Sequence, residues 1–162
     1  MTNMTKPWLV ALLGAAAMVA STGVLAQQSG AGAGFYAGLD VGNADFGSDD
    51  DTAFKLFAGY QFHPNVAAEV AYGMLYDKGG TEANSFEVVA VPMFPVANRF
   101  SVFGKFGFAH IDVDPGDRKT EITYGVGVQY DATPKLGVRV QWQRYDTDQE
   151  IDFLGVGVVA RF

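Results

Sequence analysis

The stretch Asp152–Phe162, DFLGVGVVARF, alternates between two kinds of residue. One alternate set is mostly small or charged, as in Gly155, Gly157 and Arg161. Because successive side chains of a β-strand point to opposite faces, the alternation predicts a strand with one continuous apolar face. Most chains end in a polar tail, whereas this sequence ends on a large aromatic residue. The apolar face consists of Leu154, Val156, Val158, Ala160 and Phe162.

The same alternation recurs through the sequence from Gly34 onward, and each run is bounded by turn residues. We therefore expect eight strands. The fourth is the least regular, because Pro92 lies inside it and proline cannot donate a ladder hydrogen bond. The expected strands are Phe35–Asn43, Ala53–Phe62, Val66–Tyr76, Phe86–Phe94, Phe100–Ile111, Thr120–Tyr130, Leu136–Tyr145 and Asp152–Phe162.

The connections between these strands alternate between short turns and long polar loops. The short turns are His63–Asn65, Pro95–Arg99 and Asp131–Lys135. This alternation predicts an up-and-down meander with its turns at one end and its loops at the other. The expected long loops are Ala44–Asp51, Asp77–Ser85, Asp112–Lys119 and Asp146–Glu150.

Alternation alone leaves open which face of the sheet meets solvent. A soluble barrel turns its apolar face inward, whereas a membrane barrel turns it toward lipid. Here the apolar face carries many Phe, Tyr and Trp residues, too bulky for the interior of a small barrel. Charged residues are only 18% of the chain, against roughly 25% in soluble domains. The sequence therefore predicts an all-β fold, an eight-stranded antiparallel up-and-down transmembrane β-barrel.

The N-terminus has the pattern of a secretory signal peptide. Lys6 precedes the apolar run Trp8–Ala20, and small residues at Val24 and Ala26 fit a cleavage site before Gln27. A retained membrane helix is the alternative, because Pro7–Ala26 provides about 20 mostly apolar residues. We expect a signal peptide over residues 1–26, a flexible lead-in over 27–33 and the barrel over 34–162.

Six stretches of the expected strands carry a recognisable pattern: GFYAGLDVG (34–42), KLFAGYQFHPN (55–65), AAEVAYG (67–73), FGKFGFAH (103–110), YGVGVQYD (124–131) and VRVQWQRYD (138–146). Together they resemble the small OmpA/OmpX-type outer-membrane barrels of Gram-negative bacteria. The resemblance implies secretion through the inner membrane, location in the cell outer membrane, and contact with its lipid and lipopolysaccharide. It also implies that Phe162 belongs to a C-terminal signal read by the outer-membrane assembly machinery.

Five charged residues lie on the polar face of the expected strands: Lys55, Glu69, Glu87, Lys105 and Arg139. We expect them to form a charge network that fills a narrow lumen, because buried charges need partners. The alternative is an ion gate in a narrow channel. If Phe94 lies opposite Phe100, then Lys105 lies diagonal to Glu87.

The long loops contain twelve of the 18 acidic residues but only three basic ones. We interpret them as solvated loops; the alternative is divalent-cation binding, with Asp112, Asp114 and Asp117 as weak candidates. The net charge of −7 disfavours a nucleic-acid partner. The absence of cysteine excludes disulfides and thiolate metal ligands, and no cofactor is expected. We expect a monomer.

Enzymatic activity is not expected. Some small outer-membrane barrels modify lipid A, and such hydrolases bring a serine, a histidine and an acid together. The chain has two histidines, His63 and His110, and no serine lies near His110 in the sequence, although Ser48 or Ser85 could approach it through the loops. The sequence therefore favours a structural role in membrane integrity with loops that make adhesion-type contacts. A narrow channel is the second candidate and a lipid A-modifying enzyme the third.

Overall fold

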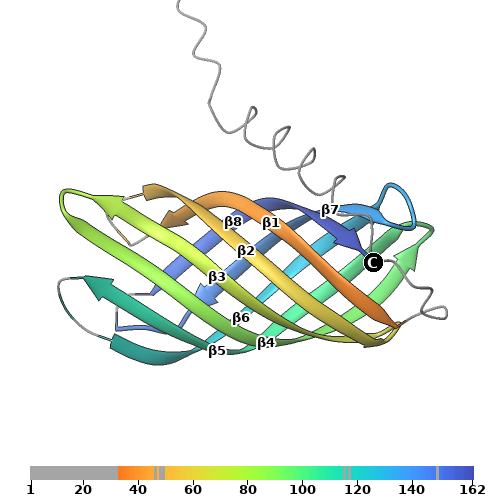
Figure 1. Ribbon diagram of the computed structural model, residues 1–162, viewed down its shortest axis with the longest axis horizontal. Coiled ribbons are helices and arrows are strands. Elements are labelled where there is room, and N and C mark those ends of the chain that lie inside the picture. The colour runs from red at the N-terminus through yellow and green to blue at the C-terminus, as the bar shows by residue number, and fades with distance from the viewer. Residues whose placement is uncertain (1–32, 46, 48–49, 115, 117, 149) are drawn as a thin grey trace, which may run out of the picture.

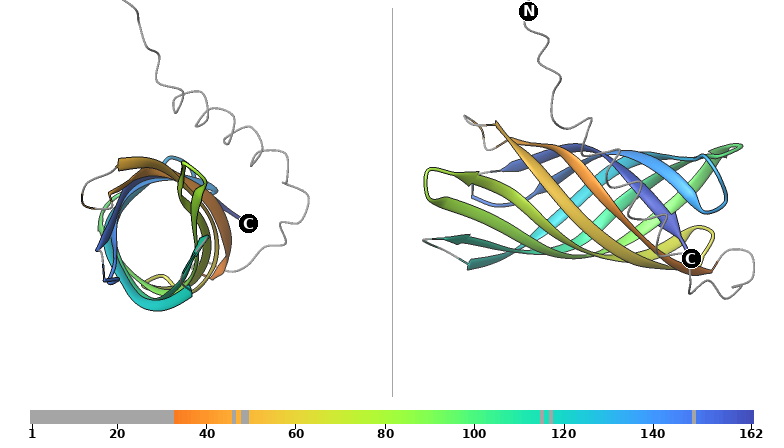
Figure 2. Two further views of the ribbon diagram at one scale, coloured as in Figure 1. Left: turned by 90° about the vertical axis from the view of Figure 1, so that its left-hand side faces the viewer. Right: turned by 45° about the horizontal axis from the view of Figure 1, so that its top comes forward.

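The computed structural model describes residues 33–45, 47, 50–114, 116, 118–148 and 150–162. These residues form eight strands, each paired with its neighbours in the sequence, and the eighth returns to the first (Figure 1). Viewed along its length, the barrel is a closed ring (Figure 2). The strands are β1 (Gly34–Asp45), β2 (Asp50–His63), β3 (Val66–Lys78), β4 (Thr81–Ala97), β5 (Phe100–Asp114), β6 (Arg118–Asp131), β7 (Leu136–Tyr145) and β8 (Ile151–Arg161).

The predicted signal peptide and most of the predicted lead-in fall in residues 1–32, outside the described residues. Cleavage after Ala26 therefore stays a prediction. Within the described residues, no helix has the length and apolar character needed to cross a bilayer.

Pairing between β1 and β8 closes the barrel. Leu39 lies opposite Val158, and Val41 lies opposite Val156. The N–H of Phe162 donates to the carbonyl oxygen of Phe35 at 2.9 Å, which extends the pairing to the last residue of the sequence. Closure leaves no sheet edge inside the membrane, where unpaired backbone groups are costly. The predicted fold class is confirmed.

The outer face of the barrel is apolar, as expected for contact with lipid. Large side chains such as Leu56 and Phe106 are 64% and 60% exposed. Aromatic pairs lie at the end that carries the short turns, where the ring centroids of Phe35 and Tyr60 are 4.8 Å apart. At the other end, Tyr124 packs against Trp142 with ring centroids 6.2 Å apart. These aromatics correspond to the two girdles of a membrane barrel. The soluble, apolar-inside alternative is wrong.

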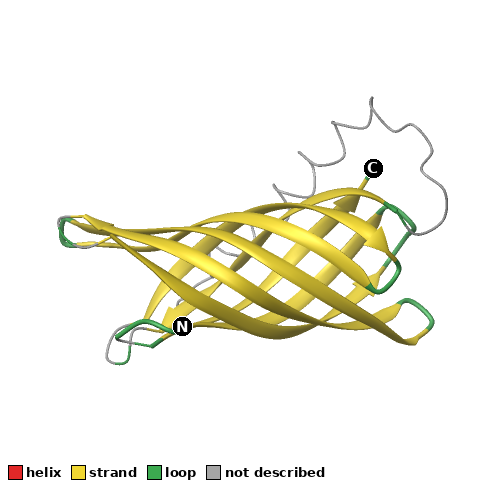
Figure 3. Cartoon of the chain, turned by 90° about the horizontal axis from the view of Figure 1, so that it is seen from below, coloured by secondary structure: helices red, strands yellow, loops and turns green. Residues whose placement is uncertain are grey.

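Two of the predicted long loops are largely strand. In place of a loop over Asp77–Ser85, β3 and β4 meet at the two-residue turn Gly79-Gly80. These glycines have φ of 62° and 80°, the conformation that two-residue hairpin turns require. The predicted loop Asp112–Lys119 shrinks similarly, because β5 runs to Asp114 and β6 begins at Arg118. The hairpins therefore continue well into the acidic segments, and only short loops join the strands (Figure 3).

The turn between β4 and β5 also differs from the expectation. Phe94 lies opposite Val102, not Phe100, because β4 continues to Ala97 with an irregularity between Pro95 and Ala97. Pro92 is accommodated inside β4, since pairing with β5 is interrupted between Ala90 and Met93. The register shift of two residues moves Lys105 away from the position diagonal to Glu87.

Candidate functional site in the barrel interior

Six charged side chains are buried among the residues that the structure describes. The three carboxylates of Asp40, Glu69 and Glu87 are at most 1% exposed. The three basic residues, Lys55, Lys105 and Arg139, are at most 3% exposed. Equal numbers of acids and bases make this layer neutral. Neutral pairing is what a buried set of charges requires, because an unpaired charge away from water costs several kcal/mol.

Arg139 of β7 is the centre of the first cluster. Its Nε donates to Oδ1 of Asp40 at 2.9 Å, and its Nη2 donates to Oδ2 of the same residue at 2.6 Å. Its Nη1 donates to Oε2 of Glu69 at 3.0 Å. The guanidinium also lies 3.5 Å from the centroid of the Phe57 ring. A planar guanidinium suits such two-point contacts, so Arg139 links β1, β3 and β7 across the lumen.

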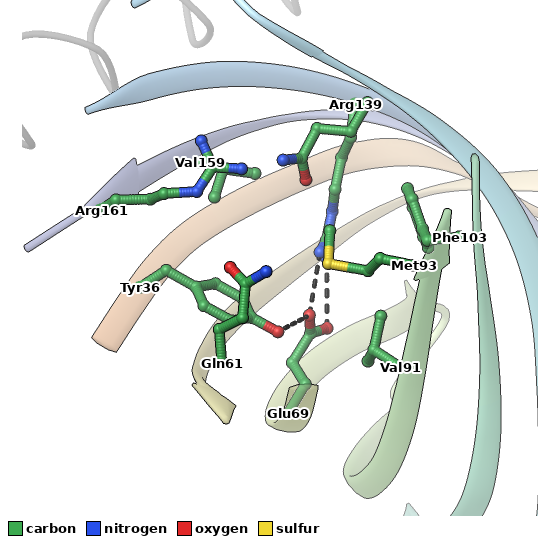
Figure 4. A pocket seen from close by; sticks show the side chains of 10 residues that line it. Tyr36, Gln61, Glu69, Val91, Met93, Phe103, Arg139, Val159 and Arg161 are labelled. Carbon is green, nitrogen blue, oxygen red and sulfur yellow. Dashed lines mark hydrogen bonds and ion pairs between the residues drawn. The ribbon is translucent and has the colours of Figure 1, made fainter. Parts of the chain in front are cut away.

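The carboxylate of Glu69 accepts hydrogen bonds from three side chains. Besides Arg139, Nζ of Lys105 lies 2.5 Å from its Oε1, and the Tyr36 hydroxyl donates to its Oε2 at 3.2 Å. Figure 4 shows the contacts of Glu69 with Tyr36 and Arg139. Gln141 donates to Asp40 at 3.0 Å, and its Oε1 is a buried atom without a hydrogen-bond partner among the described residues. Arg139 and Lys105 thus neutralise Asp40 and Glu69 within one cluster.

The second cluster is built around Glu87 of β4. Nζ of Lys55 lies 3.0 Å from Glu87 Oε1 and donates to Oε1 of Gln143 at 2.7 Å. Gln143 in turn donates to Oε2 of Glu87 at 2.7 Å. The hydroxyl of Tyr145 also donates to Glu87. The Lys55 ammonium lies 4.7 Å from the centroid of the Phe153 ring. This cluster is also neutral and satisfied by side chains.

Glycines on the inner face leave space for these contacts. A Cβ at Gly157 would lie 1.9 Å from Oδ1 of Asp40, so only glycine admits the carboxylate there. A Cβ at Gly38 would lie 2.2 Å from the ζ-carbon of Phe57. The contact between Asp40 and Arg139 therefore depends on the absence of a side chain at Gly157 of the neighbouring strand β8.

Two groups of buried apolar side chains fill the rest of the interior. The turn-end cluster comprises Tyr36, Phe57, Ala67, Ala71, Val89, Val91, Met93, Phe103 and Val159. The loop-end cluster comprises Ala44, Ala53, Leu75, Ala83, Ala109, Ile111, Tyr145, Ile151 and Phe153. The charged layer thus lies among apolar side chains on both sides. A cavity of about 10 Å³ lies on the turn side, bordered by Tyr36, Glu69 and Arg139 (Figure 4).

All five charged residues singled out in the sequence point into the lumen and are buried there. The structure brings Glu69 together with Arg139 and Lys105, and Glu87 together with Lys55. The expected approach of Lys105 to Glu87 as its diagonal neighbour is wrong, because the strand register differs.

Sequence reasoning did not single out the other members of the network. Asp40 lies at one of the alternate positions of β1 that face the lumen, and the alternation in the sequence could have identified it. Tyr145 lies at one of the alternate positions of β7 that face the lumen and could have been found in the same way. The remaining members are Tyr36, Gln141 and Gln143.

The acidic loop end contains ion pairs near the membrane surface. Asp112, one of the weak metal candidates, lies 3.1 Å from Nε of Arg118. Lys119 pairs with Asp148, and this hydrogen bond holds the pKa of Asp148 below its usual range. Within the described part of the chain, no group of three potential ligands could hold a metal ion. Asp117 lies outside the described residues, so cation binding through Asp112, Asp114 and Asp117 stays a hypothesis.

The residues considered for lipid A chemistry lie apart. His110 is exposed on the outer face, with its Nδ1 3.0 Å from the hydroxyl of Thr120. Ser85 is buried in the lumen, 3.4 Å from Glu87. Because they lie on opposite faces of the barrel wall, His110 does not act on Ser85 in this arrangement.

A closed barrel with an apolar outer face and a charged interior defines a transmembrane β-barrel. A family model described as "Outer membrane protein beta-barrel domain" matches residues 10–162, and the chain belongs to this family. The protein is accordingly a protein of the outer membrane. No curated protein sequence matches the chain.

Solved outer-membrane barrels share this fold. The attachment invasion locus protein Ail of Yersinia pestis is 17% identical, with a TM-score of 0.58 over 80% of this chain and 97% of that one. The N-terminal barrel of Pseudomonas aeruginosa OprF is 17% identical, with a TM-score of 0.62 over 80% and 99%. Neisserial surface protein A is 19% identical, with a TM-score of 0.57 over 83% and 100%.

Proposed function

We propose that this outer-membrane barrel has a structural and surface role and does not conduct ions. The observation that carries the proposal is the interior itself. Six buried charges form two neutral clusters, and buried apolar side chains lie on both sides of them. Such an interior resembles a protein core, and its contacts between distant strands stabilise the wall of the barrel.

An ion that crosses this interior would have to replace existing charge pairs. Passing Glu69 or Glu87 requires separating them from Lys105, Arg139 or Lys55, which leaves buried charges without a partner. Breaking one buried pair costs about 3–5 kcal/mol. The ion would also lose its hydration shell at the loop-end cluster, where Leu75 and Phe153 are 0% exposed.

Conductance measured in planar lipid bilayers tests this proposal. We expect the purified protein to show little or no single-channel conductance, and Lys105→Ala to leave that result unchanged. Lys135→Ala, in an exposed turn, is the matched control for loss of a lysine. Selective conductance that Lys105→Ala abolishes would favour the narrow-channel alternative instead.

The surface role rests on charge. In membrane barrels the short turns lie in the periplasm and the longer loops outside the cell. Twelve of the 18 acidic residues and three basic ones belong to the loop end, an excess of nine negative charges. A structure of Ail holds the heparin analogue sucrose octasulfate. The acidic loop end of this chain would repel such a polyanion, so we propose cationic surfaces as partners and lipopolysaccharide contacts bridged by cations.

We propose further that Phe162 contributes to recognition by the assembly machinery. Its side chain is 38% exposed at the turn end, and its backbone is fixed to β1. We expect Phe162→Ala to reduce the amount of folded protein in outer membranes, measured by the gel mobility shift of unboiled samples. Phe100→Ala is the control, since Phe100 is 43% exposed at the same end. Equal loss in both variants would contradict a special role for Phe162.

A non-enzymatic role is part of the same proposal. The family and the similar structures are outer-membrane barrels, among them an attachment invasion locus protein and a surface protein. The opposite placement of His110 and Ser85 supports this reading.

A further inference from the structure

The two ends of the barrel interior differ in how they meet solvent. At the loop end, the side chains of Leu75, Tyr145 and Phe153 are 0% exposed. At the turn end, Gln61 and Arg161 are only half-buried, and they border the same cavity as Tyr36 and Glu69. Solvent therefore has an approach to the charged layer from one end of the barrel.

The cavity at the turn end has the size and chemistry for water. Its volume of about 10 Å³ is roughly that needed for one water molecule. A bound water needs several polar partners, and the cavity wall offers the carboxylate of Glu69, the hydroxyl of Tyr36 and the guanidinium of Arg161. Figure 4 shows these three side chains around the same space.

We propose that the interior is a dead-end vestibule that opens to the periplasm. It holds water against Tyr36 and Glu69, and the loop-end cluster closes it to the external medium. Water from the periplasm therefore reaches the Glu69–Arg139 pair, whereas the Lys55–Glu87 pair, beside Tyr145 and Phe153, has no such route. This inference rests on the proposed non-conducting barrel, since an open pore would connect both ends.

Labelling of single cysteines from each side of a membrane tests the vestibule. The chain has no cysteine of its own, so each variant carries one reactive thiol. Gln129→Cys and Val159→Cys place a thiol on the cavity wall, and Ala109→Cys places one in the loop-end cluster. Gly47→Cys and Lys135→Cys mark the exposed loop end and turn end, and they report the orientation of the protein. Each variant is refolded into phospholipid vesicles, and folding is checked by the mobility of unboiled samples.

Silver ions, which are similar in size to a water molecule, bind thiols and do not cross lipid, are then applied to one side at a time, and the thiols left free are quantified after denaturation. We expect Gln129→Cys and Val159→Cys to react only from the side that labels Lys135→Cys, and Ala109→Cys to react from neither side. Reaction of the two cavity variants from the Gly47→Cys side alone would overturn the proposal.

The remaining outcomes separate the vestibule from the non-conducting barrel. Reaction from both sides would contradict the vestibule and the non-conducting barrel together. Absence of reaction from either side, in folded protein, would contradict the vestibule alone, because a structural barrel needs no opening. Reaction of Ala109→Cys from the Gly47→Cys side would show that the loop-end cluster does not close the interior.

Discussion

Arg139 contacts side chains from several strands of the barrel. It donates two hydrogen bonds to Asp40 and two to Glu69, and it covers the face of Phe57. Its removal would leave two buried carboxylates with Lys105 as their nearby base. At this scale, the barrel depends on the pairing of buried charges, because the loss of one partner leaves the other charge buried and unpaired at a high cost in free energy.

We expect Arg139→Ala to lower the free energy of unfolding by about 3–5 kcal/mol, because it leaves buried carboxylates without their partner. Urea titration of the protein refolded in lipid vesicles measures this change. Lys135→Ala, on an exposed turn, should change it by less than about 0.5 kcal/mol. Equal stability of the two variants would show that the network does not hold the barrel together.

The alternation of polar and apolar residues was enough to place Lys55, Glu69 and Glu87 inside the barrel, because successive side chains of a strand point to opposite faces. It did not give their partners. The partner of Lys105 depends on a two-residue difference in the β4–β5 register and on contacts across the lumen. Alternation within one strand gives no information about either.

At the scale of elements, the strands extend beyond the apolar outer band. On β4, the exposed apolar residue Phe86 is followed toward the loop end by Asn84 and Glu82, which are still paired with β5. The β3–β4 hairpin closes only at Gly79-Gly80. The polar residues mark where the wall leaves the lipid, and the strand itself continues into water.

This explains why the predicted loops Asp77–Ser85 and Asp112–Lys119 were too long. The polarity of these segments predicts the end of a strand, but a strand that continues outside the membrane also carries polar residues. The Gly79-Gly80 pair is itself a known hairpin signal and would have corrected the first of them.

We expect Gly79→Ala to destabilise the tip of the β3–β4 hairpin by about 1–2 kcal/mol, because its φ of 62° is unfavourable for a residue with a side chain. Hydrogen exchange of the backbone amides near Thr81 and Glu82 measures this local effect. Gly116→Ala serves as the control, since Gly116 is not among the glycines with positive φ. Equal exchange in the wild type and Gly79→Ala would contradict the strained-turn argument.

At the scale of the whole molecule, the barrel wall changes its pattern at the membrane boundary. Within the apolar band, bulky residues point outward and the charged layer lies inside. Nearer the loop end, His110 and Arg144 face outward, while Leu75, Ile111 and Phe153 pack inside. This end is therefore built like a water-soluble barrel and needs no bound ion to complete its interior.

We expect calcium to leave the thermal unfolding midpoint unchanged, because Asp112 and Asp152 near the boundary already pair with Arg118 and Arg144. Thermal unfolding followed by circular dichroism, with calcium or with a chelator, measures this. A clear rise of the midpoint with calcium, lost in Asp112→Asn, would instead support the cation-site hypothesis for Asp112, Asp114 and Asp117.

The Gly79-Gly80 turn also makes the protein a natural scaffold for display. It lies at the tip of a hairpin that extends past the apolar band, and a Cβ at either glycine would meet nothing within 4 Å. A peptide inserted between the two residues would leave the charged interior and the lipid-facing surface untouched. In the proposed orientation, with the loop end outside the cell, the same two residues that shorten a predicted loop provide a position at which foreign sequence would be carried on the cell surface.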